Sequence, residues 1–244
     1  MTARRILRLS GADTQSFLQN LVTNDVTKLN QGLVYAALLT PQGKYLADFL
    51  LMQDGDGVLL DVAEPLGDML YKRLSMYKLR ADVTIEESGL HVSRGTGEKP
   101  DGALMDPRHP ALGWRFYSDS PAPDDGTDFE AIRVAHVIPE SGVELTPDSY
   151  ILEAGFEVLN GVDFRKGCYV GQEVTARMKH KTGLRKGLRQ VQVDGEAPVG
   201  TEILAAGKAA GTLFTQADGQ GIAYLRLDRA KGDMVAGDVP VRMV

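Results

Sequence analysis

Apolar residues in the first third of the chain alternate between strand spacing and helix spacing. Short apolar runs bounded by turn residues predict strands at 6–9, 33–39, 46–52, 58–62 and 82–85. Apolar positions three and four residues apart predict helices over about 14–22 and 65–78. Because neighbouring strands are joined by short turns, the order β-α-β-β-β-α-β indicates an α+β fold, not a doubly wound parallel sheet.

One strand in this series contains a carboxylate, Asp48, among apolar neighbours. Successive side chains of a strand point to opposite faces, so alternation alone favours solvent for Asp48. The other interpretation is that Asp48 lines a ligand pocket.

The pattern of apolar and turn residues is different in the second half of the chain. Residues 118–127 are rich in Pro, Asp and Ser and predict an exposed loop, and 129–136 predicts a helix with Ile132, His136 and Val137 inward. From Leu188 onward, short strands are separated by turns rich in Gly and Asp, which is typical of a small β-barrel or sandwich. We therefore predict two parts, 1–186 and 187–244.

Composition narrows the class of protein. Apolar residues make up 43% and charged residues 25% of 244 residues, as in soluble globular proteins. No apolar run approaches the roughly 20 residues that cross a bilayer, and the first residues read as a strand, not a signal peptide. One cysteine cannot form an internal disulfide, so we expect a reducing compartment, most simply the cytoplasm. The cysteine and four histidines lack metal-ligand spacing, so no metal site is expected.

That cysteine, Cys168, lies in the octapeptide Lys166–Glu173. Gly167 and Gly171 bracket it, which indicates a turn with unusual backbone angles, and a helix is predicted to begin at Gln172. A thiol just before a helix lies near free N–H groups that favour thiolate. The alternative is that Cys168 is a small buried apolar residue.

The charge around the octapeptide favours a functional interpretation. From 165 to 189 the chain has eight basic residues and one acidic residue, within a protein of net charge −6. Such a segment is a candidate anion-binding surface, and the alternative is a solvated helix face without a specific role. The basic residues are Arg165, Lys166, Arg177, Lys179, Lys181, Arg185, Lys186 and Arg189.

The string KGCYVGQE at 166–173 resembles the signature of the YgfZ family of folate-binding proteins, relatives of the glycine-cleavage T-protein, an aminomethyltransferase. Other segments agree in order along nearly the whole chain. They are Gly11–Asp13, Phe17–Asn20, Thr23–Val26, Pro41–Lys44 leading to Asp48, Asp106–Arg108, and 137–147.

The resemblance implies a ring of α+β subdomains that admits tetrahydrofolate, followed by a C-terminal β-barrel. It implies a folate-dependent role in assembly or repair of iron–sulfur clusters, including those of tRNA-modifying enzymes. It makes Cys168 the functional residue and places Asp48 where T-protein has a carboxylate near the methylene-transfer site. The partners expected are folate and iron–sulfur proteins or cluster-assembly factors.

Folate combines a flat heteroaromatic ring with an anionic tail, so a binder needs an apolar slot, polar groups at the ring edge and cations for the tail. We predict that the octapeptide supplies Lys166, Gly167, Tyr169, Gly171, Gln172 and Glu173, and that Arg177 supplies a cation. The alternative role of Tyr169 is simply to pack the turn. The alternative role of Glu173 is to form an ion pair with Arg177. A folate-dependent aminomethyl or methyl transferase using Asp48 is the alternative function. The net negative charge argues against a nucleic-acid binder.

Overall fold

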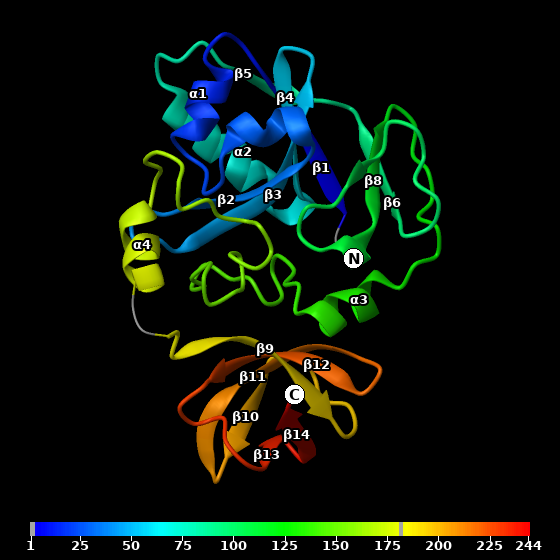
Figure 1. Cartoon of the computed structure of the whole chain (residues 1–244), viewed down its shortest axis with the longest axis vertical. Helices are drawn as coiled ribbons and strands as arrows, with labels where there is room; N and C mark the ends of the chain where they lie inside the picture. The colour runs from blue at the N-terminus through cyan, green and yellow to red at the C-terminus, as the bar shows by residue number, and fades with distance from the viewer. Residues whose placement is uncertain (1–2, 181–182) are drawn as a thin grey trace. The chain divides into compact units, whose positions relative to one another are not determined.

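A computed structural model describes residues 3–180 and 183–244, and it contains an antiparallel five-stranded sheet in the order β2-β3-β4-β1-β5. The turn at 40–44 joins β2 to β3, as the sequence predicts, and the β-α-β-β-β-α-β order is confirmed (Figure 1). The elements are β1 (Arg4–Ser10), α1 (Thr14–Gln19), η1 (Val26–Gln31), β2 (Val34–Leu39), β3 (Tyr45–Asp54), β4 (Gly57–Ala63), α2 (Glu64–Lys78) and β5 (Thr84–Glu87).

Helices α1 and α2 pack on one face of this sheet. Leu70 and Leu74 of α2 and Phe17 and Leu18 of α1 are buried against alternate strand residues. The chain thus forms a core from residues spaced by two in the strands and by three or four in the helices. Helix α1 ends at Gln19, three residues before the predicted end, and β5 begins two residues after the predicted start.

The opposite face of the sheet is partly polar, and it is also covered. Tyr35, Leu50, Asp61 and Ile6 form one cross-strand row across β2, β3, β4 and β1. A three-stranded sheet in the order β6-β8-β7 follows in the chain and supplies polar partners for this row. It contains β6 (His91–Gly95), β7 (Leu104–Met105), the short helix η2 (Pro110–Leu112) and β8 (Trp114–Ser118).

The C-terminal region forms a closed six-stranded barrel in the order β10-β11-β12-β9-β14-β13. Apolar residues from all six strands fill its core, and closure leaves no sheet edge unpaired. The barrel strands are β9 (Lys186–Val193), β10 (Thr201–Ala205), β11 (Lys208–Ala217), β12 (Gln220–Arg226), β13 (Met234–Ala236) and β14 (Val239–Met243).

The chain forms two compact units, residues 1–127 with 157–174 and residues 128–156 with 175–244. Helix α3 (Phe129–His136) has the predicted bounds, but its buried residues are Phe129, Arg133 and Val134. The prediction that His136 faces inward is wrong, because its side chain is exposed and Arg133 occupies the buried face. Helix α4 (Gln172–His180) begins at the predicted residue. The domain boundary at 186 stays a prediction.

Candidate functional site

A network of buried charged side chains lies on the second, partly polar face of the five-stranded sheet. Asp61 of β4 accepts from Arg4 of β1 at 2.6 Å, and from Arg115 and Tyr117 of β8 at 2.8 Å each. Asp61 is only 1% exposed and Arg115 only 2%. Burial opposes ionisation of Asp61, but the two guanidinium groups outweigh it and keep the pKa of this carboxyl below its usual value.

Arg115 connects this cluster to a second carboxylate, Asp106. The Nε atom of Arg115 lies 2.9 Å from Oδ2 of Asp106, and Arg108 contacts the same carboxylate through two nitrogens at 3.0 and 2.7 Å. The pKa of Asp106 is lowered well below its usual value, because the charges of Arg108 and Arg115 outweigh the effect of burial. Arg108 also places its guanidinium carbon 5.5 Å from the ring centroid of Tyr35.

Asp48 of β3 lies at the other end of this network and is linked to Arg108 through Tyr35. Its carboxylate is 4% exposed and accepts from the hydroxyls of Tyr35 at 3.0 Å and Tyr45 at 2.6 Å. The prediction from alternation that Asp48 faces solvent is therefore wrong, since later segments of the chain cover that face of the sheet. Burial, followed by the nearby charge of Asp48, raises the pKa of Tyr35 well above its usual value, so this hydroxyl stays a donor.

A pocket of about 440 Å³ opens beside Tyr35 in the same unit. Asn24 joins two of its walls, because its amide nitrogen donates to the backbone oxygens of Tyr35 and Asn160. Asn160 in turn donates to the backbone oxygen of Pro107 at 2.9 Å. The lining residues are Asn24, Lys28, Gln31, Gly32, Leu33, Val34, Tyr35, Pro107, Asn160 and Val162.

The lining of the pocket is mixed, with Leu33, Val34, Pro107 and Val162 beside polar residues. Among the described residues that line it, Lys28 is the only charged one, and its ammonium lies 2.6 Å from a carboxylate oxygen of Asp163. The volume of the pocket falls within the range of pockets that hold small-molecule ligands. Two segments that carry the family resemblance, Thr23–Val26 and Asp106–Arg108, contribute residues to the lining of this pocket. No sequence pattern assigned Tyr35 or Asn160 to a site.

Lys166, the first residue of the octapeptide, is buried within the first unit. Its ammonium donates to the backbone oxygens of Gln19 and Val22, at and just after the end of α1, and lies 5.2 Å from the ring centroid of Tyr169. Burial lowers the pKa of Lys166 to about 8, although Asp25 and Asp163 partly oppose the shift. Its hydrogen-bonding capacity is directed at the protein itself, so the structure gives no support to a direct ligand contact by Lys166.

The second glycine of the octapeptide packs against the β2–β3 turn. Gly171 has φ +83°, and a Cβ atom there would lie 2.5 Å from the backbone oxygen of Thr40. Gly167 has no such constraint, because its φ is not positive and a Cβ would meet nothing within 4 Å. The prediction of unusual backbone angles thus holds for Gly171 and is wrong for Gly167.

Between these two anchors, Cys168 is exposed. The alternative that it is a buried apolar residue is therefore wrong. Tyr169 is buried at 7% exposure, as expected for packing of the turn. Gln172 donates from its amide to the backbone oxygen of Gly167 at 3.4 Å, which closes the loop. Glu173 and Arg177 are both exposed, and the described part of the chain contains no ion pair between them.

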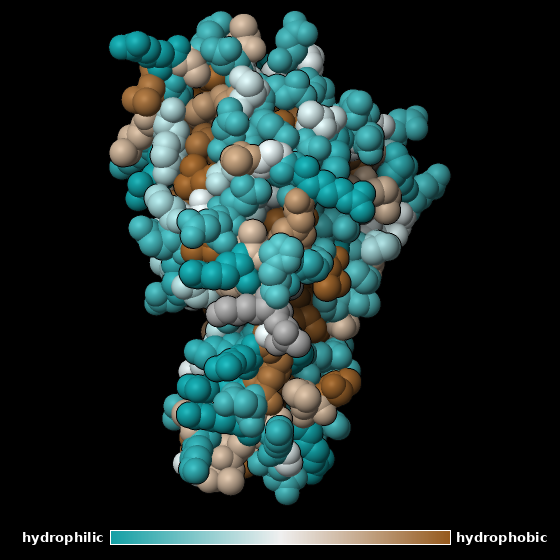
Figure 2. All heavy atoms as spheres, turned by 60° about the vertical axis from the view of Figure 1, so that its left-hand side comes forward, coloured by the Kyte–Doolittle hydropathy of each residue, from teal (hydrophilic) through white to brown (hydrophobic). Residues whose placement is uncertain are grey.

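The rest of the basic segment presents its charges to solvent to different degrees. Arg165, Lys179 and Arg185 are exposed, and Lys186 and Arg189 are partly buried. Lys181 lies outside the described residues. Hydrophilic side chains cover most of the face of the chain shown in Figure 2. The prediction that these cations bind the tail of a ligand stays a prediction.

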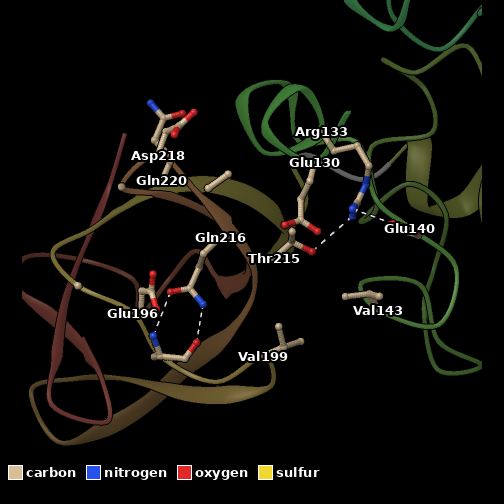
Figure 3. Close-up of a pocket in the computed structure, with 14 residues that line it drawn as sticks. Glu130, Arg133, Glu140, Val143, Glu196, Val199, Thr215, Gln216, Asp218 and Gln220 are labelled. Carbon is tan, nitrogen blue, oxygen red and sulfur yellow. Dashed lines mark hydrogen bonds and ion pairs between the residues drawn. The ribbon is translucent and has the colours of Figure 1, made fainter. Parts of the chain in front are cut away.

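A second hollow, of about 520 Å³, lies in the other unit between α3 and the barrel strands (Figure 3). Of the residues in 3–180 and 183–244, its lining includes four carboxylates and a single cation, Arg133. Arg133 pairs with Glu140 and Glu144 at 2.8 Å each. This excess of negative charge disfavours a ligand with an anionic tail. A third hollow has Asp56 as the only charged residue in its lining, within the part of the chain that the structure describes. The pocket beside Tyr35 is therefore the better candidate for such a ligand.

Residues 3–180 and 183–244 contain no group of three or more His, Cys, Asp or Glu side chains placed to hold a metal ion. Within the same residues, every helix is too short or too polar to cross a bilayer.

The fold and the barrel place the chain in the class of proteins with an aminomethyltransferase-like fold. The structure matches the glycine cleavage system aminomethyltransferase T from Bartonella henselae with a TM-score of 0.74, over 98% of this chain and 81% of that chain. The sequences are only 11% identical, so the match establishes the fold alone. Residues 185–244 match the family described as CAF17, C-terminal beta-barrel domain.

The sequence relatives identify the family. The iron–sulfur cluster assembly factor IBA57 of Mus musculus is 31% identical over 96% of this chain and 78% of its own length. The human IBA57 is 28% identical over the same shares. The IBA57 homologue of Neurospora crassa is 32% identical over 76% of this chain and 51% of its own length. The chain belongs to the IBA57 family of iron–sulfur cluster assembly factors.

These relatives correct the predicted location. All three are named as mitochondrial proteins, and this contradicts the cytoplasmic location inferred from cysteine content. The inference was too narrow, because a single unpaired cysteine indicates only that the chain needs no disulfide.

Proposed function

We propose that this protein supports the assembly or repair of iron–sulfur clusters, using a reduced folate in the pocket beside Tyr35 and the thiol of Cys168. Family membership supports the cluster role, and the YgfZ-like octapeptide supports a role for Cys168. The proposed clients are iron–sulfur proteins or assembly factors, including tRNA-modifying enzymes. The observation that carries the proposal is the exposed Cys168, held in a loop anchored at both ends.

The chemistry of the pocket suits tetrahydrofolate. Pro107 and Val162 are half-buried and offer apolar surface for a flat ring, and the amides of Gln31 and Asn160 suit a ring edge that carries donors and acceptors. Lys28 is available to exchange its Asp163 partner for the carboxylate tail. The octapeptide residues predicted to bind folate have a supporting role here, because Lys166 and Gly171 contact the protein itself.

Calorimetry with tetrahydrofolate and its one-carbon derivatives tests the ligand. Val162→Trp fills the pocket and Lys28→Glu reverses its only charge, so each should weaken binding by about tenfold or more. Lys208→Glu, on an exposed barrel residue, is the matched charge control and should bind as wild type. Equal affinities in all four proteins would remove folate from this pocket.

A cellular assay tests the cysteine. In cells lacking the protein, Cys168→Ala should fail to restore the activity of iron–sulfur enzymes although the variant folds. Because the side chain is exposed, this substitution should change the thermal midpoint little. Full restoration by Cys168→Ala would refute the thiol's role.

An aminomethyl or methyl transferase is the second candidate, because Tyr35 both lines the pocket and donates to Asp48. In that case Asp48 would hold the hydroxyl of Tyr35 in place beside the pocket, and a bound folate would supply the one-carbon chemistry. Turnover with tetrahydrofolate and an aminomethyl donor, lost in Asp48→Asn, would establish it. Absence of turnover with a lipoyl carrier would eliminate it.

A further inference from the structure

The loop that carries Cys168 has one fixed point on either side of the thiol. Before the thiol, the buried ammonium of Lys166 contacts two backbone oxygens, that of Gln19 at the end of α1 and that of Val22 three residues later. After the thiol, Gly171 lies against Thr40 in the β2–β3 turn. Both supports belong to the same compact unit as the loop.

Lys166 is well suited to this task. The oxygens at the end of a helix lack partners within the helix and carry partial negative charge, so a cation is favourable there. An ammonium has three donors, and in Lys166 two of them reach oxygens from a segment more than 140 positions earlier in the chain. The ring of Tyr169 covers the same ammonium from the loop side.

We propose that Lys166 is a positioning residue for Cys168, which fastens the loop to the end of α1 so that the exposed thiol is presented in one orientation. This inference rests on the proposed function of Cys168. Lys166 itself touches no reactant in this scheme, and its contribution is to restrict the conformations of residues 166–171. Gly171 provides the second restriction.

Three variants test this role. Lys166→Met keeps the aliphatic stem but removes all donors, and Lys166→Arg keeps the charge and the donors. Arg80→Met removes an exposed charge of the same unit, outside the basic segment, and is the matched control. Hydrogen exchange of residues 166–172 should become roughly tenfold faster in Lys166→Met, while that of α2 stays unchanged. Support of iron–sulfur enzymes should fall by about tenfold in the same variant.

The Arg variant separates positioning from mere folding. Lys166→Arg should restore slow exchange and most of the cellular activity, and Arg80→Met should match wild type in both. Wild-type exchange and activity in Lys166→Met would overturn the proposal. If Cys168→Ala retains activity, the proposed function fails, but the exchange measurements still decide whether Lys166 fixes the loop.

A measurement on the wild-type protein covers the case in which Lys166→Met does not fold. The backbone N–H of Gln172 donates to the oxygen of Tyr169 at 3.3 Å, so its exchange reports on the loop. We expect it to exchange much more slowly than the exposed segment 119–126. Exchange as fast as in that segment would show that the loop is not fixed and would refute the inference.

Discussion

Gly43 and Gly171 are in direct backbone contact, although 128 positions separate them in the sequence. A Cβ atom on Gly171 would lie 3.1 Å from the Cα atom of Gly43, and a Cβ on Gly43 would lie 2.8 Å from Cβ of Val174. Both glycines have positive φ, +75° and +83°. The β2–β3 turn and the octapeptide therefore fit together only because neither residue has a side chain.

This contact predicts that Gly171→Ala destabilises the protein while Gly167→Ala does not. In Gly171→Ala the new side chain would have to adopt the left-handed backbone conformation of this position, and its Cβ would clash with the backbone oxygen of Thr40. Together these effects should cost about 1–3 kcal/mol or more. Gly167 meets neither problem. Urea unfolding of both variants measures the difference in the free energy of unfolding. Equal losses in the two variants would contradict the contact.

The buried guanidinium of Arg115 should matter far more to stability than an exposed one. Arg115→Met leaves Asp61 and Asp106 buried with fewer partners, which should cost about 3–5 kcal/mol. Arg242→Met is the matched control, because Arg242 pairs with Asp194 on the surface and such pairs contribute about 0–1 kcal/mol. Thermal and urea unfolding compare the two. A loss below about 1 kcal/mol in Arg115→Met would show that the network is not a determinant of stability.

The same network predicts a loss of stability in acid. The folded-state pKa values of Asp61 and Asp106 lie below the unfolded value of about 3.9, so the unfolded chain binds more protons as the pH falls. The stabilisation is therefore complete above about pH 5 and is lost progressively as the pH falls below about 4. Urea unfolding from pH 7 to 2.5 should show this decline in the free energy of unfolding. The slope of that free energy against pH should be shallower in Asp61→Asn. Identical slopes in wild type and Asp61→Asn would assign the acid sensitivity to other groups.

The sequence predicted the order of elements because apolar spacing is a local property. The hairpin, α2 and the bounds of α3 followed from turns and periodicity that a few residues contain. The environment of Asp48 could not be predicted in this way, because it depends on which later segments cover the second face of the sheet. The same holds for Lys166, whose partners Gln19 and Val22 are remote in the sequence. Charge and motif located the loop around Cys168, whereas only the fold showed which of its residues point inward.

Burial of Lys166 predicts an unusual gain of stability in mild alkali. Its folded-state pKa is about 8, below the unfolded value of about 10.4. Between these two values the unfolded chain holds more protons than the folded chain, so the free energy of unfolding should rise with pH from this residue. Urea unfolding at pH 7.5, 8.5 and 9.5 measures it, with Lys166→Met as the reference that lacks the group. The free energy of unfolding of wild type, relative to that of Lys166→Met, should increase as the pH rises. A difference that stays constant, or that shifts towards the variant, would mean that the ammonium of Lys166 is not disfavoured by the folded protein.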